Sequence, residues 1–222
     1  MFIEFYNVFY YSSLIISALI GIVYFKKVET PFRWIAILIW MTLLSEGVAK
    51  YIAYGIGQTN NEVYHIFTPL EYIIYIFIFT GFLNSKKWNA MLWLSAAGLV
   101  LLEIGNTIYF QSWKEMNTNT IITENVLLVF LSLVLFLRIR KIPFQQNLLK
   151  EGVFWFNSGV LCYYAYNIMI SGLQSMKVYL LDNPPLVIYD FNLILSGLLY
   201  LTYSAAILLS STNRKQIIVQ HD

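Results

Sequence analysis

The chain has 222 residues, of which 59% are hydrophobic and only 12% are charged, and its mean hydropathy is +0.64. Soluble domains carry about 25% charged and about 45–50% apolar residues, so this composition argues against a soluble enzyme and against a disordered chain. The formal net charge of only +2 provides no basic field for nucleic acid. These values predict a polytopic membrane protein whose first partner is the lipid bilayer.

Seven apolar segments are long enough to cross a bilayer as helices, for which about 20 mainly apolar residues are needed. The runs are continuous and do not alternate, which favours helices over a β-barrel. The predicted spans are residues 5–25, 34–56, 63–83, 91–110, 120–139, 152–173 and 188–210. The connections are short and polar, so residues 1–222 are expected to form a single heptahelical, all-α membrane domain.

The distribution of basic residues predicts the orientation. Eleven Lys and Arg residues lie in the first, third and fifth connections, at their edges or after the last span, whereas only Lys114 and Lys177 lie on the other side. Basic residues flanking spans stay in the cytoplasm. We therefore expect the amino terminus outside and the carboxyl terminus inside, in the cytoplasmic membrane.

Several kinds of reactive site are missing from the sequence. The single Cys162 excludes an internal disulfide, and two histidines, His65 and His221, are too few for a three-histidine zinc site. The chain also lacks a Walker loop, a GxGxxG pattern and a Gly-x-Ser-x-Gly elbow. We expect no metal, no cofactor and no catalytic residue, and no enzymatic activity.

The two halves of the chain match each other at a shift of 112 residues. Residues 45–56 and 157–168 are identical at six of twelve positions, including Gly47/Gly159, and Pro31-Phe32 falls on Pro143-Phe144. After a four-residue insertion, Pro69-Leu70 falls on Pro185-Leu186. The matches predict a parallel repeat of about 5–83 and about 120–210, joined by a linker helix at about 91–110. The alternative is chance matching within an apolar alphabet.

This 3+1+3 plan resembles, over the whole chain, the SWEET sugar facilitators and the PnuC vitamin transporters. The residues Gly47…Tyr54-Gly55-Ile56 look like the second helix of a SWEET triplet, although the Pro-Gln pair of the SWEET first helix is missing. Microbial rhodopsins share the seven-helix plan, but residues 188–210 contain no lysine for a retinal Schiff base. The segment His65-Ile-Phe-Thr-Pro-Leu-Glu-Tyr72 is similar to one in uncharacterised seven-span bacterial membrane proteins.

Polar side chains recur within the predicted spans, where they are costly and usually face the bundle interior or a cavity. They fall in the middle and outer half of the bilayer and share helix faces, which predicts an outward-facing polar pocket with tyrosine walls. The candidate binding residues are Glu46, Lys50, His65, Glu71, Tyr75, Glu103, Asn106, Tyr164, Asn167, Asp190 and Asn192.

Each candidate also has a simpler interpretation. Glu46 and Lys50 could form only an intrahelical ion pair, and His65 could lie at the headgroup interface. Glu124 and Asp190 could cap their helices near the amino ends. Asn and Ser stripes often join helices, and the repeated glycines are expected to mark close helix packing.

Charge arithmetic favours a cationic ligand. Glu46, Glu71, Glu103 and Asp190 meet one certain cation, Lys50, and four buried carboxylates cannot all stay ionised beside it. A cation, a proton-coupled solute or a polar organic amine would relieve this imbalance.

Three functions fit the sequence. The first is a transporter or facilitator of a small cationic or polar organic solute, which is also what the SWEET and PnuC resemblance implies. The second is a heptahelical receptor, sensor or assembly subunit that acts through a signalling partner or as a homo-oligomer. The third is an intramembrane lipid-modifying enzyme in which His65 and Glu71 supply a base.

Overall fold

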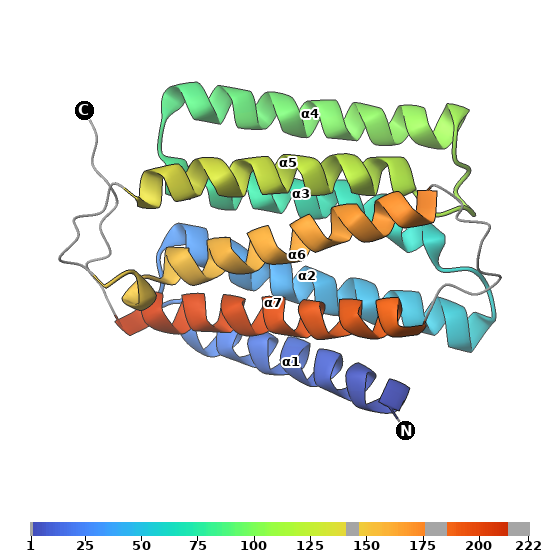
Figure 1. The fold of residues 1–222 in the computed structure, drawn as a ribbon, viewed down its shortest axis with the longest axis horizontal. Helices are drawn as coiled ribbons and strands as arrows, with labels where there is room; N and C mark the ends of the chain where they lie inside the picture. The colour runs from blue at the N-terminus through green and yellow to red at the C-terminus, as the bar shows by residue number, and fades with distance from the viewer. Residues whose placement is uncertain (1, 141–146, 176–185, 213–222) are drawn as a thin grey trace.

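The computed structural model describes residues 2–140, 147–175 and 186–212, which form helices joined by short connections (Figure 1). The long helices are α1 (Phe2–Tyr24), α2 (Thr30–Lys50), α3 (Asn61–Leu83), α4 (Lys86–Tyr109), α5 (Thr118–Ile139), α6 (Gly152–Ser175) and α7 (Leu186–Thr212). A π-helical segment, Tyr51–Ile56, continues α2, and a 3₁₀ turn, Leu148–Lys150, precedes α6. Each predicted span therefore corresponds to a helix.

Six of these helices are long and apolar enough to cross a membrane. Their outer surfaces carry exposed apolar side chains such as Leu94, Leu101 and Leu137, as contact with lipid requires. Helix α6, with 24 residues, is of similar length but is not among these six. The prediction of a polytopic helical membrane protein is confirmed.

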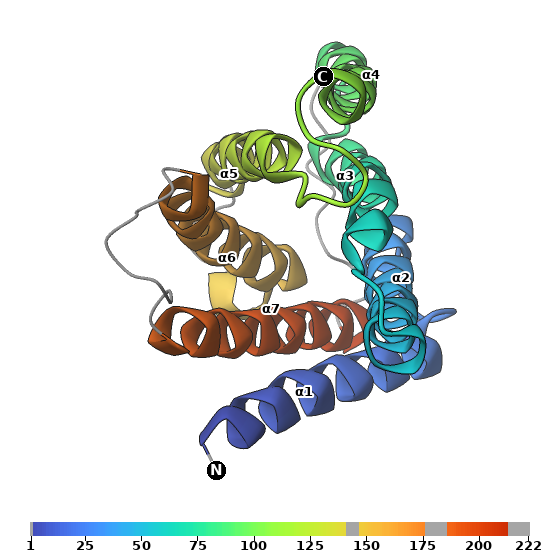
Figure 2. The same cartoon turned by 90° about the vertical axis from the view of Figure 1, so that its right-hand side faces the viewer.

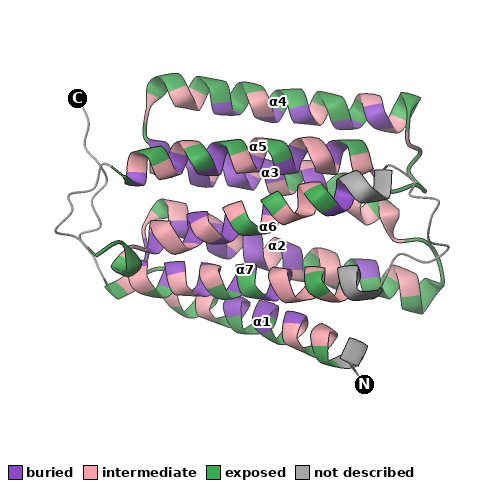
Figure 3. Ribbon diagram, viewed as in Figure 1, coloured by how far each residue is buried: buried purple, intermediate pink, exposed green. Residues whose placement is uncertain are grey.

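The helices are arranged around a common interior. Neighbours pack in the order α1, α2, α3, α5, α6 and α7, and α7 returns to α1, so that six helices close a ring (Figure 2). Helix α2 also touches α7. Helix α4 lies outside the ring against α3 and α5, and most of its residues are exposed or half-buried (Figure 3).

An aromatic and aliphatic core fills one end of the ring. Phe32 near the start of α2, Phe79 near the end of α3 and Phe156 near the start of α6 are fully buried, together with Ile35 and Ile207. The Phe79 and Phe156 ring centroids are 5.9 Å apart in an edge-to-face arrangement. We call this the closed end; it is the end that carries the α1–α2 connection.

The glycines of the repeat differ in their surroundings. A Cβ atom on Gly159 would overlap the side chain of Thr202, and one on Gly81 would lie 2.5 Å from Pro31 Cγ. A Cβ on Gly197 would lie 2.5 Å from the ring of Phe9. These three mark close packing, as predicted. The prediction is wrong for Gly47, where a Cβ would meet no atom within 4 Å.

This difference gives a matched pair of substitutions. Gly159→Ala should lower the free energy of unfolding by about 1–3 kcal/mol, because the added methyl group forces α6 and α7 apart. Gly47→Ala should leave it unchanged or raise it by up to about 1 kcal/mol, because glycine is unfavourable inside a helix. Unfolding of the purified protein in mixed micelles by SDS titration measures both, and equal effects would contradict the packing described.

The repeat itself stays a prediction. Exchanging α1–α2–α3 with α5–α6–α7 preserves the order of helices around the ring. However, Tyr51–Ile56 is π-helical with an exposed Tyr51, whereas the matching residues 163–168 are α-helical and Tyr163 is half-buried. The matched residues Pro143, Phe144 and Pro185 lie outside the described residues, as do the basic residues Lys141, Lys177, Arg214 and Lys215 and the terminal His221.

Candidate functional site

A cavity of about 390 Å³ lies inside the ring, next to the core of the closed end. All six ring helices contribute to its walls, and Met116 contributes from the connection between α4 and α5. Three carboxylates line it: Glu46 from α2, Glu71 from α3 and Glu124 from α5. Its lining, as far as the described residues show, contains no Lys, Arg or His.

The structure brings six of the eleven candidate residues together on this cavity. They are Glu46, Glu71, Tyr75, Tyr164, Asn167 and Asn192. Lys50 instead lines a neighbouring hollow, which shares Glu46 with the cavity. His65, Glu103 and Asn106 belong to a separate network between α3 and α4, and the half-buried Asp190 does not line the cavity.

Glu71 ends a chain of tyrosine hydroxyl groups. Tyr164 Oη donates to Glu71 Oε1 at 2.9 Å and lies 3.0 Å from Tyr75 Oη. Tyr75 in turn is hydrogen-bonded to Tyr203. A phenol has one proton, so when Tyr164 donates to the carboxylate, its oxygen accepts from Tyr75. The chain joins α3, α6 and α7 across the ring and supplies Glu71 with a hydrogen bond.

Glu46 is held by α1. Tyr11 Oη donates to Glu46 Oε2 at 3.1 Å, and Lys50 Nζ lies 3.5 Å from the centroid of the Tyr11 ring. No ion pair joins Glu46 and Lys50, both of which the structure describes. The simple intrahelical pair is therefore wrong. Tyr11 serves both residues, with its hydroxyl on the carboxylate and its ring under the ammonium group.

Glu124 is the carboxylate that sequence reasoning misplaced. A capping role was the simpler interpretation of Glu124, but Asn117 occupies the N-cap position of α5 and Glu124 lies further along the helix. It is 3% exposed, lines the cavity, and its Oε1 has no hydrogen-bond partner. Asn125 Nδ2 and Asn192 Oδ1, which belong to lining residues, are also buried without partners.

Most of the cavity's tyrosines were missed as individual site residues. The described lining includes Tyr10, Tyr11, Tyr64, Tyr75, Tyr163, Tyr164, Tyr200 and Tyr203. In the sequence they are part of a general abundance of tyrosine, which belts and packing also explain. The helical spacing of Tyr200 and Tyr203 with Asn192 and Ser196 did indicate a polar stripe and tyrosine walls, but it did not single out either tyrosine as a binding residue.

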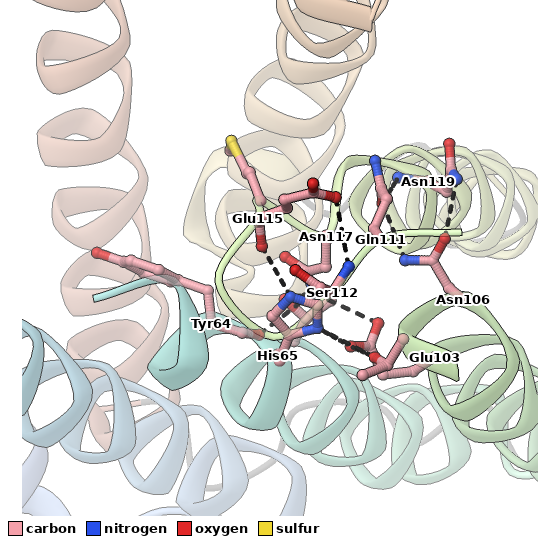
Figure 4. Close-up of polar contacts among 12 residues, drawn as sticks. Tyr64, His65, Glu103, Asn106, Gln111, Ser112, Glu115, Asn117 and Asn119 are labelled. Carbon is pink, nitrogen blue, oxygen red and sulfur yellow. Dashed lines mark hydrogen bonds and ion pairs between the residues drawn. The ribbon is translucent and has the colours of Figure 1, made fainter. Parts of the chain in front are cut away.

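His65 forms a buried pair with Glu103 (Figure 4). His65 Nδ1 lies 2.6 Å from Glu103 Oε1, and His65 Nε2 lies 2.9 Å from the backbone oxygen of Glu115. A backbone oxygen only accepts, so Nε2 carries a proton. Nδ1 therefore faces the carboxyl group of Glu103, to which Thr107 Oγ1 also donates at 3.2 Å. Glu103 was expected to line the cavity and does not, whereas the position of His65 at the headgroup interface stays a prediction.

The same network fixes the connection between α4 and α5. Asn106 Nδ2 donates to Gln111 Oε1 at 2.9 Å, and Asn119 Nδ2 donates to Asn106 Oδ1 at 2.9 Å. Asn61 Nδ2 donates to the backbone oxygen of Lys114 at 2.7 Å. These bonds hold residues 110–117, and with them Met116, against the cavity. The network positions a wall of the cavity without lining it.

No protein-family model matches the chain, no curated protein is significantly similar to it, and no solved structure matches its fold.

Proposed function

We propose that the protein is a transporter or facilitator of a small cationic or polar organic solute, which binds in the cavity inside the helix ring. The observation that carries this proposal is that the described lining residues include three carboxylates and no basic side chain. Buried anions need a compensating cation or proton, because burial without one is costly. A cationic solute that binds in the cavity would supply the charge that compensates these carboxylates.

The shape of the ring supports the proposal. The cavity adjoins a solid core at the closed end, so a solute reaches it from the other end. With the carboxyl terminus in the cytoplasm of a bacterium, the closed end faces inward and the cavity outward. The order of helices around the ring is the same when α1–α2–α3 and α5–α6–α7 are exchanged, which supports a parallel repeat. In transporters built from repeats, one repeat commonly rocks against the other, so that the binding site opens to each side of the membrane in turn.

The test is a melting-temperature screen of solutes followed by counterflow. A cationic solute should raise the melting temperature of the purified protein in detergent by mass action. The same solute should exchange across liposomes that contain only this chain. Glu71→Gln should abolish both effects, whereas Glu62→Gln, at an exposed position early in α3, should preserve them.

Binding without exchange would replace this proposal with a receptor, sensor or assembly subunit, and a signalling partner would then be sought. For the lipid-modifying alternative, the carboxyl group beside His65 is that of Glu103 and not that of Glu71.

A further inference from the structure

The charge of the cavity points to the kind of solute. Its three carboxylates come from three helices, and the nearby Lys50 has its ammonium group on the Tyr11 ring. Nowhere in the described chain do three His, Cys, Asp or Glu side chains gather as around a metal ion. The volume of about 390 Å³ exceeds that of a single water in liquid, about 30 Å³, more than tenfold. An organic cation fits these facts better than a bare metal ion.

The buried polar atoms without partners specify which bonds that cation makes. Glu124 Oε1 and Asn192 Oδ1 are acceptors that need N–H or O–H donors, and Asn125 Nδ2 is a donor. Leaving such atoms unpaired is unfavourable, because each loses the hydrogen bond that water would otherwise provide. A ligand with several N–H groups satisfies the acceptors, whereas a quaternary ammonium group, which has no N–H, does not.

The tyrosine walls suit an ammonium group as well. Tyr163 and Tyr164 stand edge to face with centroids 5.0 Å apart at 86°, and Tyr75 and Tyr164 do so at 5.6 Å and 87°. In such an edge-to-face pair, the edge of one ring points at the face of the other, so the two rings present their faces in different directions. A cation is attracted to a tyrosine face within about 6 Å of the ring centroid.

We infer that the solute is a primary organic ammonium, held through its N–H groups by Glu124 and Asn192 and surrounded by tyrosine rings. This inference rests on the proposed function, because it names the class of solute that the cavity takes. Carboxylates on α2, α3 and α5 give the cavity more than one anionic position, so an amine with two ammonium groups complements it better than one with a single group.

The experiment uses three probes of similar length: 1,4-diaminobutane, 1,4-butanediol and 1,4-bis(trimethylammonio)butane. Binding to the purified full chain in detergent is measured by isothermal titration and by the shift in melting temperature. The diamine should bind at least tenfold more tightly than the diol, which lacks charge, and than the bis-quaternary compound, which lacks N–H donors.

Variants locate the bound amine. Glu124→Gln should weaken diamine binding at least tenfold and Asn192→Leu severalfold, whereas the exposed Glu62→Gln should bind as the wild type does. Tyr163→Phe keeps the ring and should retain binding, whereas Tyr163→Leu should weaken it. A melting temperature of the unliganded variant close to that of the wild type shows that a loss of binding is not a loss of folding.

Equal binding of the diol would overturn the requirement for charge, and equal binding of the bis-quaternary compound would overturn the role of N–H donors. Diamine binding unaffected by Glu124→Gln would overturn the placement. If the diamine fails to bind but another solute from the screen shifts the melting temperature and undergoes counterflow, this inference fails while the proposed function stands. If no solute does so, both fail.

Discussion

Replacing His65 with leucine should lower the free energy of unfolding by about 3–5 kcal/mol, because it leaves the buried Glu103 without its imidazole partner and with only the hydrogen bonds from Thr107 and Asn117. His65 is 1% exposed and Glu103 6% exposed, so water cannot replace the lost contact fully. The substitution also removes the donor to the backbone oxygen of Glu115. SDS titration in mixed micelles measures the loss, and amide hydrogen exchange in residues 110–117 should become faster.

A double substitution tests whether the stability depends on the interaction between His65 and Glu103 or on each residue independently. In the variant with both His65→Leu and Glu103→Leu, no buried charge is left unpaired, and apolar replacements of a buried pair are often neutral or stabilising. Most of the lost stability should therefore return. If the two single losses simply add, the two residues do not act as a pair, since independent sites show additivity.

The helices were predictable because bilayer-spanning segments have a strong compositional signal. The predicted spans overlap all seven helices, and the differences lie at their ends. Helix α2 starts at Thr30 instead of residue 34, since Pro31 suits the first turn of a helix, and α4 starts at Lys86 instead of residue 91. Hydropathy marks the part of a helix inside hydrocarbon, whereas backbone hydrogen bonds extend it into the polar boundary.

The site was predictable only in part, because helical spacing places a residue on a face but does not name the neighbour of that face. His65 and Glu71 are six residues apart and therefore point about 120° apart around α3. Glu71 points into the ring, whereas His65 points toward α4, where Glu103 meets it. Packing between segments distant in the chain determines which helices close the ring and keeps α4 outside it.

The roles of Glu103 and Glu124 were reversed for the same reason. Both are single acidic residues within predicted spans, and the sequence made Glu103 a candidate binding residue but Glu124 only a possible helix cap. The structure pairs Glu103 with His65 and leaves Glu124 on the cavity without a partner for Oε1. Neither position could be assigned without knowing that α5, and not α4, belongs to the ring.

Replacing Glu124 with leucine should raise the free energy of unfolding of the protein without ligand by about 1–3 kcal/mol. Its carboxyl group is buried, and its unpartnered Oε1 loses the hydrogen bond that water gives it in the unfolded chain. Leucine has a similar size and no polar atom to desolvate. SDS titration and the melting temperature without added amine measure the gain.

Glu71→Leu provides the matched control with the opposite sign. Glu71 accepts a hydrogen bond from Tyr164, so its removal leaves a hydroxyl of the buried tyrosine chain without its acceptor and should destabilise the protein by about 1–3 kcal/mol. Stabilisation by Glu124→Leu together with loss of diamine binding would identify Glu124 as a residue kept for binding at the expense of stability, as binding sites often require. Destabilisation by Glu124→Leu would instead show that its carboxyl group has a structural partner and that the cavity is not poised for a cation.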